Sequence, residues 1–163
     1  MALNTVLDLS EIFKRYSKIF SNAFKQKIID RKSFDGTDYS ELALSTVEGS
    51  KKGNRKRRRG EYTRLFDTGK FRSHAWKGTP YDNGFNIQLT DEYARKVVKY
   101  NDANSNSVNE GIVQPPYIVP RNVEDIHNMD AYKQMQIDIS KTIELQLEQN
   151  AGSVHTTTVK LGI

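Results

Sequence analysis

The sequence predicts an α+β fold, in which a small antiparallel sheet packs against a long helix near each end of the chain. Two observations indicate this fold. Apolar residues recur every three or four positions over residues 8–29 and again over 124–149, and an alternating segment between them contains the turn sequence Asp82-Asn83-Gly84. The chain has 163 residues, which is enough for one hydrophobic core, so residues 1–163 are predicted to form a single domain with extended arms.

The first helix is expected over residues 8–29, and Asp8 or Ser10 can cap its start. Its apolar face consists of Leu9, Ile12, Phe13, Tyr16, Ile19, Phe20, Ala23, Phe24 and Ile28. A turn is expected over residues 33–38, because the pair Asp35-Gly36 supplies a side-chain acceptor and a residue that tolerates positive φ.

Residues 39–64 show little periodicity and are predicted to form an extended basic arm. Residues 51–60 read KKGNRKRRRG and hold seven of the 25 Lys and Arg, so the remaining 18 basic residues face 20 acidic ones and the charge without this run is −2 instead of +5. Such a run is typical of a solvated loop, or of contact with nucleic acid or an acidic partner. The candidate contact residues are Lys51, Lys52, Arg55, Lys56, Arg57, Arg58 and Arg59.

A hairpin is expected between residues 69 and 90. Alternation predicts a first strand over 71–77 and a second over 85–89, joined through Asp82-Asn83-Gly84. A short helix should follow over 91–100, with Tyr93, Ala94, Val97 and Val98 on one side. The single Trp76 is interpreted as a core or interface residue and not as a platform for base stacking.

The last third of the chain begins with a polar loop over residues 101–110. Residues 114–121 read QPPYIVPR, and three prolines predict an extended connector or edge strand there. The second long helix is expected over 124–149 and should stop at Asn150 and Gly152. The tail, residues 151–163, has a β-prone end that could complete a sheet in its own subunit or in a neighbour.

The sequence favours no catalytic, metal or cofactor site. It has no cysteine, no phosphate-binding glycine loop and no nucleophile elbow, and its three histidines, at positions 74, 127 and 155, belong to no ligand motif. No stretch approaches the roughly 20 apolar residues of a membrane span, and the first residues do not have the pattern of a signal peptide. We therefore expect a non-enzymatic protein that is made in the cytosol, with no cofactor and no membrane partner.

One enzymatic alternative is an aspartic protease. Residues 65–69 read LFDTG, which resembles the active-site turn of retroviral-type aspartic proteases, where two copies of Asp67 would share a proton in a dimer. However, Lys70 follows where those enzymes carry a small residue, and two long helices dominate the predicted fold. We interpret Asp67, Thr68 and Gly69 as a turn, in which Asp67 accepts backbone amides and Gly69 adopts positive φ.

Taken in order, several short segments resemble the phage virion morphogenesis family, the tail-completion and head-tail joining proteins of tailed bacteriophages. The resemblance covers roughly residues 9–148. Its segments are the Asp-Gly turn followed by YSEL at 39–42, the basic run, LFDTGKFRS at 65–73, Glu92-Tyr93-Ala94 and Pro120-Arg121 before the last helix. The resemblance assigns structural roles to the positions that match motifs of the family. These positions are Asp67, Thr68, Gly69, Tyr93, Ala94, Pro120 and Arg121.

The resemblance implies a structural subunit of the virion that forms a homo-oligomeric ring at the neck or the tail end and is assembled in the host cytoplasm. Its partners would be copies of itself, other neck or tail proteins, and DNA in the lumen of the ring. The residues 39–64 and 153–163 are the candidates for exchange between neighbouring subunits, because ring contacts must be heterologous and must close. The alternative from another class is a nucleic-acid-binding protein that acts through the basic run.

Overall fold

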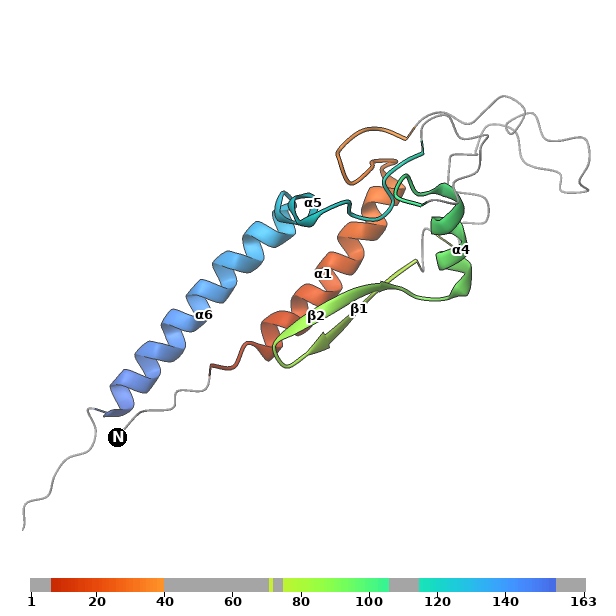
Figure 1. The fold of residues 1–163 in the computed structure, drawn as a ribbon. Coiled ribbons are helices and arrows are strands. Elements are labelled where there is room, and N and C mark those ends of the chain that lie inside the picture. The colour runs from red at the N-terminus through yellow and green to blue at the C-terminus, as the bar shows by residue number, and fades with distance from the viewer. Residues whose placement is uncertain (1–6, 40–70, 72–74, 106–114, 155–163) are drawn as a thin grey trace, which may run out of the picture.

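The computed structural model describes residues 7–39, 71, 75–105 and 115–154, with the backbone alone for 152–154. In chain order the elements are α1 (Ser10–Ile29), β1 (Trp76–Tyr81), β2 (Gly84–Leu89), α4 (Glu92–Asn101), α5 (Val123–His127) and α6 (Asp130–Val154). Figure 1 shows an elongated arrangement in which α1 lies between the hairpin and α6, and the start of α1 lies near the end of α6. The predicted α+β class, with a small antiparallel sheet and helices at both ends, is confirmed.

Helix α1 is the centre of the fold because its apolar side chains recur every four residues. Ile12, Tyr16, Phe20, Phe24 and Ile28 are all buried, and β1 packs against the same helix. The helix begins at Ser10, with Leu9 as the N-cap residue and no side-chain cap. The prediction that Asp8 or Ser10 caps the helix is therefore wrong, although Asp8 precedes the cap residue and accepts a hydrogen bond from the Ser10 amide at 2.9 Å.

The hairpin has a two-residue connection. Trp76 pairs with Leu89 at one end and Tyr81 with Gly84 at the other, which leaves Asp82 and Asn83 as the turn. The predicted first strand over residues 71–77 is wrong in its position. Phe71 is helical and its carbonyl accepts from the Ala75 amide at 2.9 Å, and β1 starts only at Trp76.

The second long helix is interrupted, contrary to the prediction of one helix over 124–149. Helix α5 is capped by Asn122, whose side chain accepts from the Asp125 amide at 3.0 Å, and α6 restarts at Asp130, an acid that favours a helix N-terminus. Helix α6 continues to Val154, because a single internal glycine such as Gly152 costs only about 1 kcal/mol relative to alanine. The predicted stop at Asn150 and Gly152 is therefore wrong, and the tail predicted from residue 151 begins after α6.

A buried carboxylate holds the proline-rich connector in place. Asp102, the C-cap residue of α4, is 1% exposed, and its carboxylate accepts from the backbone amides of Ile118 at 2.6 Å and Val119 at 2.7 Å. The turn at 33–38 attaches to the same connector through the Phe34 amide and the Tyr117 carbonyl, 3.0 Å apart, and Gly36 has the expected positive φ of 86°. Residues 115–121 form a connector and not a strand.

The short helix expected over 91–100 is observed as α4, with Asp91 as its cap. The Asp91 carboxylate accepts from the Ala94 amide at 2.8 Å, and Ala94 is buried. No helix in the described ranges is both long and apolar enough to cross a membrane.

Candidate interaction groove

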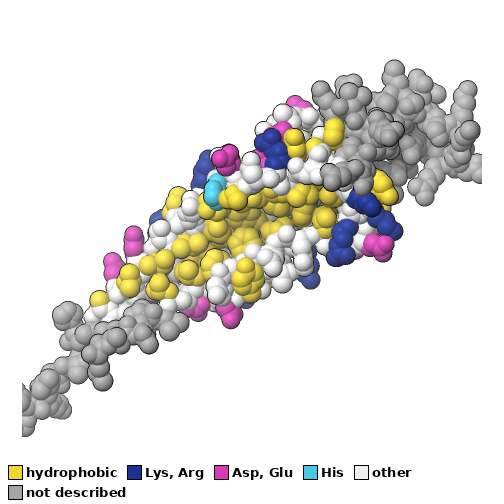
Figure 2. Space-filling view, viewed as in Figure 1, with side chains coloured by type: hydrophobic (Ala, Val, Ile, Leu, Met, Phe, Trp, Pro, Cys, Tyr) yellow, Lys and Arg dark blue, Asp and Glu magenta, His cyan; other side chains and the backbone are white. Residues whose placement is uncertain are grey.

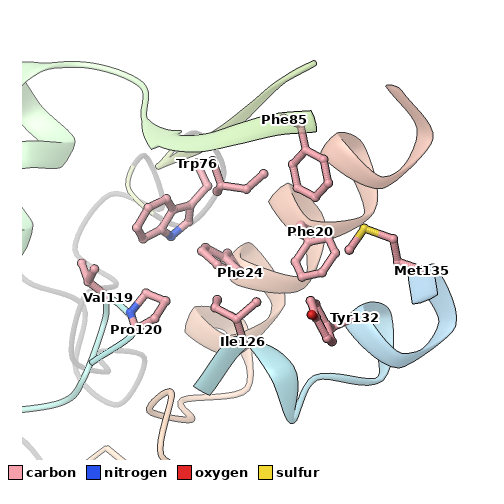
Figure 3. A pocket seen from close by; sticks show the side chains of 10 residues that line it. Phe20, Phe24, Trp76, Phe85, Val119, Pro120, Ile126, Tyr132 and Met135 are labelled. Carbon is pink, nitrogen blue, oxygen red and sulfur yellow. The ribbon is translucent and has the colours of Figure 1, made fainter. Parts of the chain in front are cut away.

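Helices α1 and α6, the hairpin, α5 and the connector surround an apolar pocket, which we call the central pocket. Its cavity volume is about 320 Å³. Figure 3 shows that side chains from all these elements point toward the same space. They are Phe20, Phe24, Trp76, Phe85, Ile87, Val119, Pro120, Ile126, Tyr132 and Met135.

Aromatic rings form one wall of the central pocket. The Phe24 ring meets the Trp76 ring edge-on with centroids 5.1 Å apart, and the Phe20 and Phe85 centroids are separated by 5.4 Å. Trp76 is 4% exposed and its indole Nε1 is buried without a hydrogen-bond partner. In Figure 3 this nitrogen lies on the side of the indole that faces Phe24, Pro120 and Ile126. A buried polar atom without a partner is rare, so this donor requires a physical explanation.

Helix α6 leaves much of its apolar surface uncovered. None of its described side chains is fully buried, although it packs along α1. Ile137, Leu145 and Leu147 are 46%, 57% and 50% exposed. At about 100° per residue these three side chains spread over roughly 160° of the helix, so α1 alone cannot cover them. Figure 2 shows that apolar side chains form a continuous band along the long axis of this face of the molecule.

Polar contacts fix α6 in its place on α1. The Asp138 carboxylate accepts from the Tyr16 hydroxyl at 2.7 Å and also pairs with Arg15. Further along, Gln146 makes two hydrogen bonds to the backbone of Asp8, of 2.9 and 2.6 Å. The hydrogen bond from Tyr16 is the main reason that the pKa of Asp138 lies below its usual value. These contacts therefore fix the position of α6 relative to α1 and to the residues just before it.

A second polar cluster joins the connector, α5 and the turn at 33–38. Asp125 is 7% exposed, and its carboxylate accepts from the backbone amide of Arg121 at 2.7 Å and from the Arg121 guanidinium at 3.2 Å. The same guanidinium lies 4.0 Å from Asp35 and 4.7 Å from the centre of the Tyr117 ring. The side-chain hydrogen bond from Arg121 is the main cause that lowers the pKa of Asp125.

We expect Asp125→Asn to reduce the acid sensitivity of the protein. Because the folded-state pKa of Asp125 is lowered, its ionisation stabilises the fold above the ordinary pKa of about 4, and this stabilisation is lost as the pH falls below that value. The variant should lose about 1–2 kcal/mol at pH 7 and correspondingly less at pH 3, as measured by urea unfolding. Asp38→Asn is the control, since that carboxylate is 74% exposed in a surface ion pair with Lys32 and should matter little at either pH. Equal losses at the two pH values for Asp125→Asn would contradict the assignment.

The candidate site residues predicted from the sequence fall into two groups. Pro120 lines the central pocket, and the next residue, Arg121, belongs to the polar cluster. Tyr93 and Ala94 lie on α4, where Ala94 is buried and Tyr93 is 38% exposed. The seven cations of residues 51–59 and the three residues Asp67, Thr68 and Gly69 lie outside the described residues. Among the described members of the predicted set, Pro120 and Arg121 lie together, and Tyr93 and Ala94 lie on α4.

Sequence reasoning missed the central pocket and the two aspartates that organise its surroundings. Phe20 and Phe24 belong to the predicted apolar face of the first helix, and Tyr132 and Met135 lie in the predicted second helix. Nothing in the periodicity indicates that a cavity remains between these side chains. Asp102 lies in the segment predicted as a polar loop, and Asp138 lies within the predicted second helix, for which no contact was predicted. A single acid directly after a helix and before a proline-rich connector is the only available signal for Asp102.

Comparisons with protein-family models, curated proteins and solved structures gave no match to this chain. The class of the protein is therefore defined by its fold and surface alone. It is an elongated α+β protein with a pair of long helices, an apolar band along one face and a central pocket.

Proposed function

We propose that this protein is a structural assembly subunit that acts through its interfaces and needs no catalytic group. The observation that carries the proposal is the uncovered apolar surface of α6, with Ile137, Leu145 and Leu147 half exposed. Exposed apolar side chains gathered on one helix, together with the apolar band in Figure 2, are typical of a protein interface. A rigid helix pair with such a band is suited to repeated contacts between copies of the same chain.

The resemblance of the sequence to the phage virion morphogenesis family supports a more specific role. In this proposal the subunits form a closed ring at the head-tail joint or the tail end of a tailed phage, where they contact other neck or tail proteins. The protein would be assembled in the host cytoplasm and remain in the virion. The α+β class is compatible with that role, and the family motif residues Pro120 and Arg121 adjoin the central pocket.

The test is the oligomeric state of the purified chain. We expect oligomers that form with increasing concentration, persist in high salt because the contact is apolar, and appear as rings by electron microscopy. Replacing Leu145 and Leu147 together by Gln should leave the helix content unchanged and dissociate the oligomers, since both side chains are exposed in the single subunit. The matched control replaces Glu144 and Glu148, which are also exposed, by Gln. A wild-type chain that stays monomeric at high concentration contradicts the proposal.

A second candidate function is nucleic-acid binding through residues 51–59, favoured by seven cations in ten residues without an acid. Binding to DNA should then weaken steeply with salt, because each neutralised phosphate releases counterions. Replacing the seven cations by Ser should abolish this binding. Under the assembly proposal the same variant still forms rings, so imaging it separates a DNA contact from the ring contact.

A further inference from the structure

We propose that the central pocket receives the segment 155–163 of a neighbouring copy, with Val159 and Leu161 as the inserted side chains and a backbone carbonyl of that segment accepting from Trp76 Nε1. The inference rests on the proposed assembly function and names the contact by which one subunit holds the next.

The pocket has the size and chemistry of a receptor for a few apolar side chains. Its volume of about 320 Å³ is at the small end of the roughly 300–1,000 Å³ that ligand sites span. Its lining is formed by apolar and aromatic side chains, with Trp76 Nε1 as an unpaired donor among them. The pocket therefore fits a group that brings apolar surface together with one hydrogen-bond acceptor, as an extended peptide does.

Residues 155–163 read HTTTVKLGI and have this character. In an extended chain, residues two apart point to the same side, so Val159 and Leu161 face one way and Lys160 faces the other. The carbonyl groups of such a segment supply the acceptor that Trp76 lacks. Because the segment contains no acid, its insertion places no carboxylate side chain in the apolar pocket.

Geometry assigns this segment to a neighbour and not to its own subunit. Met135 is the α6 pocket residue nearest to the end of the helix, and it lies 19 residues before Val154, or about 28 Å along the helix. A chain that turns back from Val154 can place Val159 at most about 17 Å away and Leu161 about 24 Å away. The two side chains cannot occupy the pocket of their own subunit together, whereas a second copy has no such limit.

The experiment measures binding of a labelled peptide of residues 153–163 to the full chain by fluorescence anisotropy. The receptor is the full chain carrying Val159→Asp and Leu161→Asp, so that its own segment does not compete. We expect saturable binding, accompanied by a change in the emission of Trp76, the only tryptophan. The peptide with the same two Asp substitutions should bind about 100-fold more weakly, because two apolar side chains no longer enter the pocket.

Two receptor variants locate the contact. Val119→Phe fills the pocket and should abolish binding, whereas Val123→Phe, at a side chain 64% exposed and outside the pocket, should leave it unchanged. Trp76→Phe keeps an aromatic ring but removes the donor and should weaken binding about 2- to 12-fold. Circular dichroism confirms that each variant is folded.

The outcomes separate this inference from the proposed function. If the full chain forms rings but the wild-type peptide does not bind, or binds equally to the Val119→Phe receptor, the pocket assignment is overturned while the assembly function stands. If the peptide binds as expected and the full chain oligomerises without forming closed rings, the pocket assignment holds and the ring is excluded. Equal binding to wild-type and Trp76→Phe receptors overturns the assigned hydrogen bond.

Discussion

Gly78→Ala is expected to destabilise the protein by about 3 kcal/mol or more, at the upper end of the cost of overpacking. A Cβ atom at Gly78 would lie 2.0 Å from the backbone oxygen of Ser17 and 2.5 Å from its carbonyl carbon. These are backbone atoms of α1 and cannot rotate away, so β1 would have to move off the helix. The hydrogen bond of 2.9 Å from the Ser21 hydroxyl to the Trp76 carbonyl would be lost with that movement. The expected result is a large decrease in the urea concentration at the unfolding midpoint.

The same hairpin offers a matched control. At Gly84 an added Cβ would come within 2.8 Å of the Tyr81 hydroxyl, but Tyr81 is 51% exposed and can rotate into solvent. Gly84→Ala should therefore cost less than about 1 kcal/mol, although the substitution and the sheet are the same. If both variants unfold at the same urea concentration, the close approach of β1 to α1 does not determine the stability of the hairpin.

The contrast between these two glycines shows what could be predicted from the sequence. The turn was predictable because Asp82-Asn83-Gly84 constrains the backbone locally. The role of Gly78 was not, because it depends on which part of α1 the strand crosses, and that is a tertiary contact between residues 61 positions apart. Similarly, the alternation over 71–77 predicted a strand in the wrong place, since over so few residues it does not exclude the helical backbone observed at Phe71.

The central pocket likewise depends on tertiary contacts that the local sequence pattern does not specify. The four-residue spacing of Phe20 and Phe24 predicted a helix face, and this was confirmed. Periodicity indicates which side chains avoid water, but it does not indicate whether the opposing elements fill the space between them. The break between α5 and α6 at Asn128 and Met129 was also missed, because apolar spacing continues across it from Ile126 to Tyr132. That break places Ile126 on α5 and Tyr132 on α6, and both side chains line the pocket.

Asp102→Asn should destabilise the protein by about 2–4 kcal/mol, because one buried carboxylate holds three backbone amides. Its Oδ2 accepts from Ile118 and Val119, and its Oδ1 accepts from the Asn104 amide at 2.8 Å. An asparagine has one acceptor oxygen, and its NH₂ group would face an N–H donor in either orientation. At least one of the three amides therefore loses its partner, and the remaining bonds are no longer assisted by charge. Urea unfolding at pH 7 measures the loss.

Asp91→Asn tests whether that loss is specific, because Asp91 caps the other end of α4. Asparagine is as good an N-cap residue as aspartate, and the single bond to the Ala94 amide can be kept, so this variant should unfold close to the wild type. The connector held by Asp102 carries Val119 and Pro120 into the central pocket. Asp102→Asn should therefore also weaken binding of the 153–163 peptide under conditions in which the variant is folded, whereas Asp91→Asn should not. Unchanged stability in Asp102→Asn would mean that the connector is positioned by its prolines and apolar contacts without this carboxylate.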